Sequence, residues 1–546
     1  MKPFKDIAGL RPRRSVFDNS YYKIFDCKLG QLIPVFCDLF LPGDQVKISV
    51  EALVRANPLL TPVMHRIDLK VDYFKVPLRI MFPKPMYTDR NGDPIKDKNG
   101  HEFIPDPSSW EDFITGGVSG KLEPIQPKWL PTSPAECGLY SLWDYFGNPL
   151  GIPLKINAWQ KRAYQLVYNE YFRATDLEDP VDLDDFTLHL AKWEKDYFTS
   201  ALTDVVRGTA PSVPLSGQGS ATFNSNLLLK TIGGMQDNQQ VLGVSAQGIY
   251  DINNHTPGVL GWLGQGGNWP LTSEALGIRK EDLNVNSIDM SKVSTFDVND
   301  LRYIFQIQKY LERSMRAGSR YTEQILAHWG VHNGDARLQR PEYIGGMRSP
   351  VVISEVLQTS SSDATSPQGT LAGHGIGTAN QSIGSTYCNE HCVVIGIMRL
   401  MPKPAYQQGI NRQWLYDSRF EYPTPELVNL GEQEIFNMEL CATADATFNK
   451  GIFGYQGRYD EHRVKQNMVC GSVRSTAPQP IGQWQLARIF DVNAPPALNK
   501  EFLDCVDDQR YSAVQNFPSW IVTFGNRVRR VAPLPVIGTP GLIDHN

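Results

Sequence analysis

Alternation of apolar and polar residues predicts antiparallel β-strands in the first hundred residues. From Ile67 to Tyr73 every second residue is apolar, and the residues between them are charged. This pattern is typical of a strand with one buried face and one face in water, as in an antiparallel sheet. The segment 46–54 is predicted as a second strand, because the turn residues Pro42-Gly43-Asp44 precede another apolar run.

Three later segments extend this prediction. Residues 393–398 are apolar on both faces, so they are expected at the centre of a sheet. Residues 520–524 and 528–531 are predicted as two strands, with Gly525-Asn526 as a turn or bulge between them. Residues 360–380 are interpreted as an irregular surface loop.

Helical periodicity is limited to three segments. One helix is predicted from a cap at Asn157 through Phe172, and a second over residues 300–317 with Asp300 as its cap. A third is expected to begin near Thr322 and to end at Gly330. The chain is therefore predicted to be mainly β, with partly helical loops.

Residues 209–278 differ from the rest of the chain. These seventy positions hold four charged residues and twelve glycines, whereas 20% of the whole chain is charged. The stretch is interpreted as an insertion rich in Gly, Asn and Gln, and a disordered linker is the alternative. The aromatic residues Tyr250, Trp262 and Trp269 favour ordered packing, since disordered segments contain few aromatics.

Charge excludes a protein that coats nucleic acid over its whole surface. The 546 residues include 53 Lys and Arg and 58 Asp and Glu, for a net charge of −5. Residues 1–20 read as an extended basic arm, and a second basic group lies near the C-terminus. The candidate phosphate contacts are Lys2, Lys5, Arg11, Arg13, Arg14, Arg527, Arg529 and Arg530. The alternative is a solubilising tail with ordinary strand-edge charge.

Motifs for catalysis are absent from the sequence, so no enzyme is predicted. Residues 116–121 resemble a phosphate loop, but Thr115 and Leu122 replace the required Gly and Ser or Thr. Cys388, His391 and Cys392 lack the second pair of ligands that a structural zinc site needs. No metal or cofactor is expected. Membrane insertion is not expected either, because no stretch approaches about 18 consecutive apolar residues.

A set of ordered strings is more specific than these patterns. The strings are Arg14–Asp18, Leu41–Asp44, Leu301–Arg313, Arg320–Glu323, Arg340–Gly346, Tyr406–Ile410, Leu430–Gln433 and Phe453–Tyr459. Together they resemble the major capsid protein of the microviruses, which are small icosahedral phages with circular single-stranded DNA. The gokushovirus-like branch is the most similar. The resemblance runs from about residue 11 to residue 542, although Gly457 and Asn429 stand where the family usually has Glu and His.

The resemblance implies a viral single jelly roll, an eight-stranded antiparallel β-sandwich with long insertions between strands. It implies a basic arm over residues 1–20, a capsid domain over 21–546 and an inserted threefold protrusion over 205–296 that includes Tyr250, Trp262 and Trp269. The expected function is a T=1 shell around the genome, within the virion and assembled in the host bacterial cytoplasm. The expected partners are copies of the chain, the single-stranded DNA, a small basic DNA-binding protein, a scaffolding protein, a DNA pilot protein and a host receptor.

A carbohydrate-binding β-sandwich is the alternative function. Trp262 and Trp269 in a polar insertion would suit stacking on sugars. Against this alternative, the N-terminus has no apolar segment of a secretory signal, and no recognisable carboxylate pair is present.

Overall fold

The computed structural model describes residues 14–81, 128–209, 211, 228–229, 242–245, 248–251, 298–332, 334–335, 338–357, 371–514 and 517–537. The chain divides into two compact units. The first consists of Met1–Arg207 with Glu312–Asn546, and the second of Gly208–Leu311. The second unit contains a three-stranded sheet in the order β10 (Gly248–Asp251), β9 (Leu242–Ser245), β8 (Leu228–Leu229), and most of helix α6 (Val298–Ala317).

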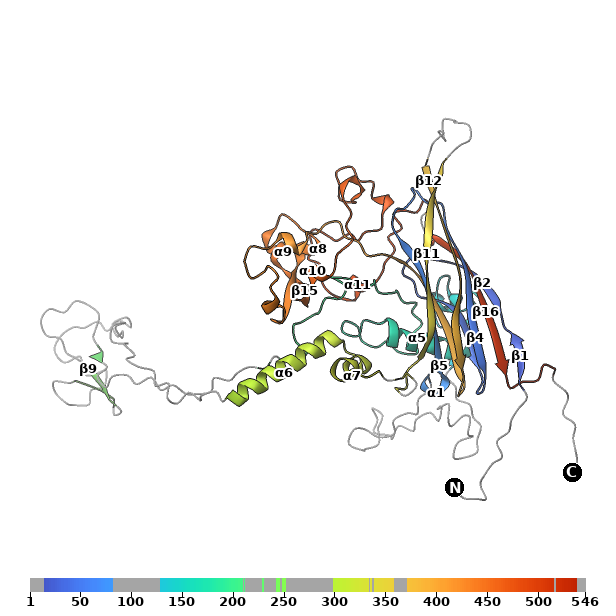
Figure 1. Cartoon of the computed structure of the whole chain (residues 1–546), viewed down its shortest axis with the longest axis horizontal. Helices are drawn as coiled ribbons and strands as arrows, with labels where there is room; N and C mark the ends of the chain where they lie inside the picture. The colour runs from blue at the N-terminus through green and yellow to red at the C-terminus, as the bar shows by residue number, and fades with distance from the viewer. Residues whose placement is uncertain are drawn as a thin grey trace, which may run out of the picture. The chain divides into compact units, whose positions relative to one another are not determined.

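An antiparallel sheet dominates the first unit (Figure 1). Its strands lie in the order β1, β16, β4, β12, β11, β5, β13, β3, and β2 also pairs with β16. Their bounds are β1 Ser15–Asp18, β2 Tyr21–Cys27, β3 Ile33–Phe40, β4 Gln45–Ala56, β5 Ile67–Pro77, β11 Glu342–Leu357, β12 Leu371–Tyr387, β13 Cys392–Pro402 and β16 Trp520–Ala532. Few helices interrupt this pattern, so the chain is mainly β, as predicted.

The sheet curls so that its two halves face each other across one apolar core. Alternate residues of β4 and β16, such as Val50 and Phe524, share this core with Val71 of β5 and Val394 of β13. Burial of these side chains holds the two halves together. Each Å² of apolar surface that is removed from water stabilises the fold by about 25 cal/mol. The architecture confirms the predicted jelly-roll β-sandwich.

A buried amide bridges the two halves inside this core. The hydroxyl of Tyr73 on β5 donates to Asn526 Oδ1 at 2.6 Å, and Asn526 Nδ2 donates to the carbonyl of Val35 on β3 at 3.0 Å. The predicted break at Gly525-Asn526 is therefore wrong. Both residues continue β16 in register with β4, because the inward Asn526 side chain finds partners across the core.

Strands β5 and β13 are covered on their other face as well. Helices α1 (Leu78–Met81) and α5 (Trp159–Val167) pack there against Phe74 of β5 and Ile395 of β13. The central position predicted for residues 393–398 is confirmed, since β13 lies between β5 and β3. The wet face predicted for β5 is wrong. Asp68 is 1% exposed and pairs with Arg348, so opposite charges replace water there.

Two further boundaries differ from the prediction. Residues 371–380 belong to β12 instead of an irregular loop, because β4 and β11 bind this Gly-rich segment on both sides. Helix α6 begins at Val298, so Asp300 lies in its first turn and does not cap it. The third helix is confirmed as α7 (Tyr321–Trp329), with Gly330 in the left-handed conformation at φ 68°. Helix α5 continues as a π-helical turn over Tyr168–Phe172, as far as predicted.

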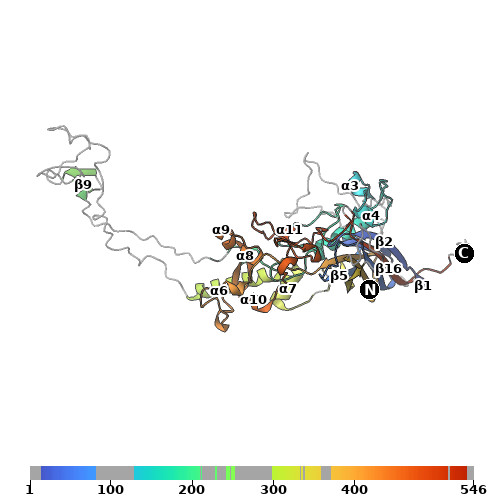
Figure 2. The same cartoon turned by 90° about the horizontal axis from the view of Figure 1, so that it is seen from above.

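Short elements flank the sandwich (Figure 2). Helices α3 (Pro134–Cys137) and α4 (Leu142–Tyr145) lie beside β2, where the hydroxyl of Tyr145 donates to the carbonyl of Asp26 at 2.8 Å. The remaining elements are β6 Lys128–Trp129, β7 Ile156–Asn157, β14 Glu432–Phe436, α8 Asn437–Leu440, α9 Ala446–Lys450, β15 Ile452–Gly457, α10 Asp460–Arg463 and α11 Lys500–Leu503. Both views place α8–α11 on the far side of the sandwich from β1, β2 and β16.

Replacing Tyr73 with Phe tests the cross-sheet amide. The variant leaves Asn526 Oδ1 buried without its donor, which costs about 1–3 kcal/mol of unfolding free energy. Urea unfolding of the full chain measures the loss. The matched change Tyr22→Phe alters a hydroxyl on a side chain that is 72% exposed, so it should shift stability by less than about 0.5 kcal/mol. Equal effects of the two changes would contradict the role given to Asn526.

Candidate nucleic-acid interface

Successive side chains along each strand point alternately into the core and away from it, so the sheet has a second, outward surface. Side chains that alternate with the core residues of β2, β16, β4 and β12 point away from the sandwich. We call this surface the outer face. Its members include Tyr22, Ile24, Ile521, Thr523, Gly525, Arg527, Arg529, Lys47, Ser49, Glu51, Leu53, Arg55, Ile376, Thr378, Asn380, Ser382 and Ser385.

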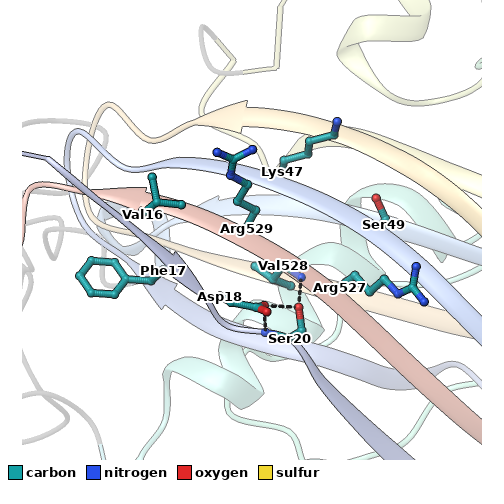
Figure 3. Close-up of a pocket in the computed structure, with 9 residues that line it drawn as sticks. All are labelled: Val16, Phe17, Asp18, Ser20, Lys47, Ser49, Arg527, Val528 and Arg529. Carbon is teal, nitrogen blue, oxygen red and sulfur yellow. Dashed lines mark hydrogen bonds between the residues drawn. The ribbon is translucent and has the colours of Figure 1, made fainter. Parts of the chain in front are cut away.

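Strand register gathers positive charge at one end of the outer face, which we call the basic end. Arg529 lies opposite Lys47, and Arg527 lies opposite Ser49. These residues line a groove with the β1–β2 segment (Figure 3). The lining residues are Val16, Phe17, Asp18, Ser20, Lys47, Ser49, Arg527, Val528 and Arg529. Three cations from two neighbouring strands thus face one open groove.

Ser20 fixes the rim of this groove. Its hydroxyl accepts a hydrogen bond from the backbone N–H of Val528 at 3.1 Å and donates to the carboxylate of Asp18. The backbone N–H of Ser20 also donates to Asp18, at 3.0 Å. Both hydrogen bonds hold the pKa of Asp18 below its usual value, and the one from the Ser20 hydroxyl has the larger effect. Asp18 therefore stays ionised and limits the net positive charge of the groove.

Arg527 and Glu51 form an exposed ion pair on the outer face. Arg527 Nη2 lies 2.7 Å from Glu51 Oε2, and the side chains are 58% and 50% exposed. Exposed pairs of this kind contribute little stability, because water and salt screen both charges. A phosphate that approaches the groove can replace Glu51 as the partner of Arg527 at little cost.

Arg530 has a different environment from its neighbours. It lies on the inward side of β16, where Arg530 Nη2 is 2.5 Å from Asp44 Oδ2 and the guanidinium lies 5.1 Å from the ring centre of Phe40. The Asp44 side chain is fully buried. Arg530 therefore neutralises a buried carboxylate in the turn before β4, and it is not exposed on the outer face as Arg527 and Arg529 are.

Arg14 ties the base of the N-terminal arm to the basic end. Its guanidinium lies 5.9 Å from the ring centre of Tyr387 at the end of β12, with Nη2 3.5 Å from the hydroxyl. β1 follows at once and pairs with the end of β16. Lys2, Lys5, Arg11 and Arg13 lie outside the described residues. The chain thus joins the sheet at Ser15, opposite Ala532 and three residues along β16 from Arg529.

The aromatic residues predicted for the insertion belong to the second unit. Tyr250 lies on β10, opposite Gly243 of β9. Trp262 and Trp269 lie outside the described residues. The possible phosphate loop at residues 116–121 also lies outside them.

Sequence patterns missed three residues of the outer face. Lys47 and Arg55 fall between the apolar residues of β4, so the alternation that predicted this strand carried their signal. Tyr22 lies on β2, where apolar and polar residues do not alternate regularly enough to predict a strand.

The two cysteines on either side of His391 do not belong to a metal cluster within the described residues. Cys388 and Cys392 are buried and hydrogen-bonded to each other. No three His, Cys, Asp or Glu side chains in the described ranges are grouped so that they could hold a metal ion. Among the described helices, none has the length and apolar character needed to span a bilayer.

Known proteins resemble this chain over nearly its whole length. The model of the family described as "Capsid protein (F protein)" matches residues 6–542. Capsid protein VP1 of Chlamydia phage 1 is 30% identical, over 99% of this chain and 97% of the relative. Capsid protein VP1 of Bdellovibrio phage phiMH2K is 31% identical, over 98% and 97%. Capsid protein VP1 of Spiroplasma virus 4 is 28% identical, over 94% and 92%.

Alanine variants distinguish the structural arginine from the exposed one. Arg530→Ala leaves the buried Asp44 carboxylate without its cation and should cost about 3–5 kcal/mol. Arg527→Ala removes an exposed pair and should cost about 0–1 kcal/mol. Thermal unfolding of both full-length variants provides the comparison. A larger loss for Arg527→Ala would refute the assignment.

Proposed function

The chain belongs to the capsid protein (F protein) family of the microviruses, and from this premise we propose that it is the major capsid protein of a T=1 icosahedral shell around circular single-stranded DNA. Membership in this family places the protein in the virion and assigns it a structural role. The proposal adds the shell geometry, the genome and the surface that contacts it.

Exposed apolar side chains in the first unit support self-assembly. Trp414 is 75% exposed, Trp329 69% and Phe420 55%. A monomer gains nothing from leaving such side chains in water, whereas contacts between copies would bury them. A closed shell repeats each contact by symmetry, so individually weak contacts suffice.

The basic end of the outer face is the observation that supports genome binding. Register places Lys47, Arg527 and Arg529 together on an open surface of the jelly roll. The chain as a whole carries a net charge of −5, so this local cluster is not a consequence of overall composition. The basic arm, joined to the same end through Arg14, adds the cations Lys2, Lys5, Arg11 and Arg13 to this cluster.

The insertion and the other partners complete the proposal. Residues 205–296, with Tyr250, Trp262 and Trp269, form a threefold protrusion used for host attachment. A small basic DNA-binding protein would neutralise phosphates that this acidic chain leaves unpaired. A scaffolding protein, a DNA pilot protein and a host receptor are the further partners, and assembly takes place in the host bacterial cytoplasm.

Removing three charges from the basic end tests genome contact. The triple variant Lys47→Gln, Arg527→Gln and Arg529→Gln should flatten the salt dependence of oligothymidine binding. The slope of log affinity against log salt should change by about 2, since each lost contact to a single strand contributes roughly 0.7. Fluorescence anisotropy of the unassembled full chain at several salt concentrations gives the slope.

A control triple carries the same change of charge elsewhere. Lys155, Arg419 and Lys450 are exposed and lie outside the strands of the outer face. Their replacement by Gln should leave the slope nearly unchanged. Equal slopes for the two triples would show that only net charge matters and would contradict a site on the outer face.

Deleting residues 2–14 tests the arm. Electron micrographs should show closed T=1 shells for the full chain and for the deletion, and the deleted shells should contain less DNA because the arm's net charge of +4 is lost. The ratio of absorbance at 260 and 280 nm reports DNA content. A full-length variant with Lys2, Lys5, Arg11 and Arg13 changed to Gln should lose DNA similarly. Unchanged DNA content in both would contradict the role of the arm.

A further inference from the structure

The end of the outer face opposite the basic end carries an exposed apolar row. Ile521 of β16 lies opposite Arg55 of β4, Arg55 lies opposite Ile376 of β12, and Ile376 lies opposite Val352 of β11. Ile24 of β2 lies one step further along, opposite Thr523. The exposed fractions of the apolar members are 43% for Ile521, 38% for Ile376, 65% for Val352 and 64% for Ile24.

Tyr22 lies between this apolar row and the basic end. It is 72% exposed and sits opposite Gly525, which has no side chain to cover the ring. Across from Gly525 on β4 lies Glu51, which forms the ion pair with Arg527, and the small residue Thr523 precedes Gly525 by two positions on β16. A flat ligand can therefore lie on the exposed Tyr22 ring above Gly525.

Distances along the strand match a nucleotide. Gly525, opposite Tyr22, lies two residues from Arg527, a step of roughly 7 Å along β16. This is about the separation between the phosphate and the base of one nucleotide. A phosphate held by Arg527 would thus place its base over Tyr22, and the following bases over the apolar row.

We propose that the outer face binds single-stranded nucleic acid with its bases on Tyr22 and the apolar row and its phosphates on Lys47, Arg527 and Arg529. The inference rests on the proposed function and adds the part of the strand that each half of the face recognises. A duplex cannot bind in this way, because its bases are already stacked on one another. The face therefore selects unpaired DNA.

The charge pattern favours bases over a protein segment. Arg55 stands between Ile521 and Ile376, and an exposed guanidinium can stack on a base or pair with a phosphate. The carboxylate at this end, Asp26, accepts a hydrogen bond from the hydroxyl of Tyr140 at 3.1 Å, so it is already engaged. Single-stranded nucleic acid complements both halves of the face, because its flat bases match the apolar row and its phosphates match the basic end.

Serine variants provide the test on the unassembled full chain. Tyr22→Ser and Ile521→Ser should each weaken binding of a fluorescein-labelled oligothymidine, roughly tenfold for Tyr22, which corresponds to one lost stacked base. Affinity for a duplex of equal length and the salt slope should both stay unchanged. Tyr422→Ser, on a side chain that is 57% exposed away from the outer face, should alter neither. An oligonucleotide carrying 5-iododeoxyuridine should crosslink to Tyr22, as identified by mass spectrometry.

Three outcomes would overturn the inference. Equal loss of single-strand and duplex affinity in Tyr22→Ser would remove selectivity for bases. Crosslinks confined to residues outside the outer face would show that the bases do not bind on this face. Loss of shell formation in Ile521→Ser, with oligothymidine affinity intact, would make the row a contact between copies. A basic-end triple variant that binds normally would contradict the phosphate contacts of the proposed function, and the inference with them. The outcomes for Tyr22→Ser and Ile521→Ser leave those phosphate contacts untouched, so the two failures are distinguishable.

Discussion

A buried amide in the core helps to hold the two halves of the sheet in one register. Asn526 accepts from Tyr73 and donates to Val35, so it ties β16 to β5 and β3 at fixed positions. Apolar contacts alone tolerate sliding, whereas a buried polar group must meet its partners or lose its hydrogen bonds. Because side chains alternate, the inward direction of Asn526 forces Gly525, Arg527 and Arg529 outward. The chemistry of the outer face thus follows from a bond within the core.

The outer face is then organised along its strands from charge to apolar surface. Lys47 and Arg529 lie at one end, and Ile521 and Ile376 lie at the other, with the strands running directly between them. Such an arrangement suits a ligand that has anionic groups at one end and flat apolar groups at the other, separated by a similar distance. A sandwich offers this surface without loops, so its geometry is as rigid as the core beneath it.

The sequence predicted the fold class and several strands, because alternation and buried runs are local signals. It misplaced what depends on distant partners. The alternation in β5 predicted that its charged residues face water, but Asp68 is buried because Arg348, from a distant part of the chain, pairs with it. Gly525-Asn526 read as a turn because the partners of Asn526 are hundreds of residues away. For the site, the sequence grouped Arg527, Arg529 and Arg530 as equals, and only the inward direction of Arg530 separates a structural cation from two exposed ones.

The pairing of β16 with β1, β2 and β4 has a consequence for synthesis on the ribosome. The strands nearest the N-terminus emerge first, yet their central neighbour comes from residues 520–532, near the other end of the chain. The electropositive groove therefore cannot form before Arg527 and Arg529 have been translated, since they are two of its three cations. Long-range closure of this kind slows folding. It also means that the groove is assembled only after β16 has been synthesised and has paired with β4.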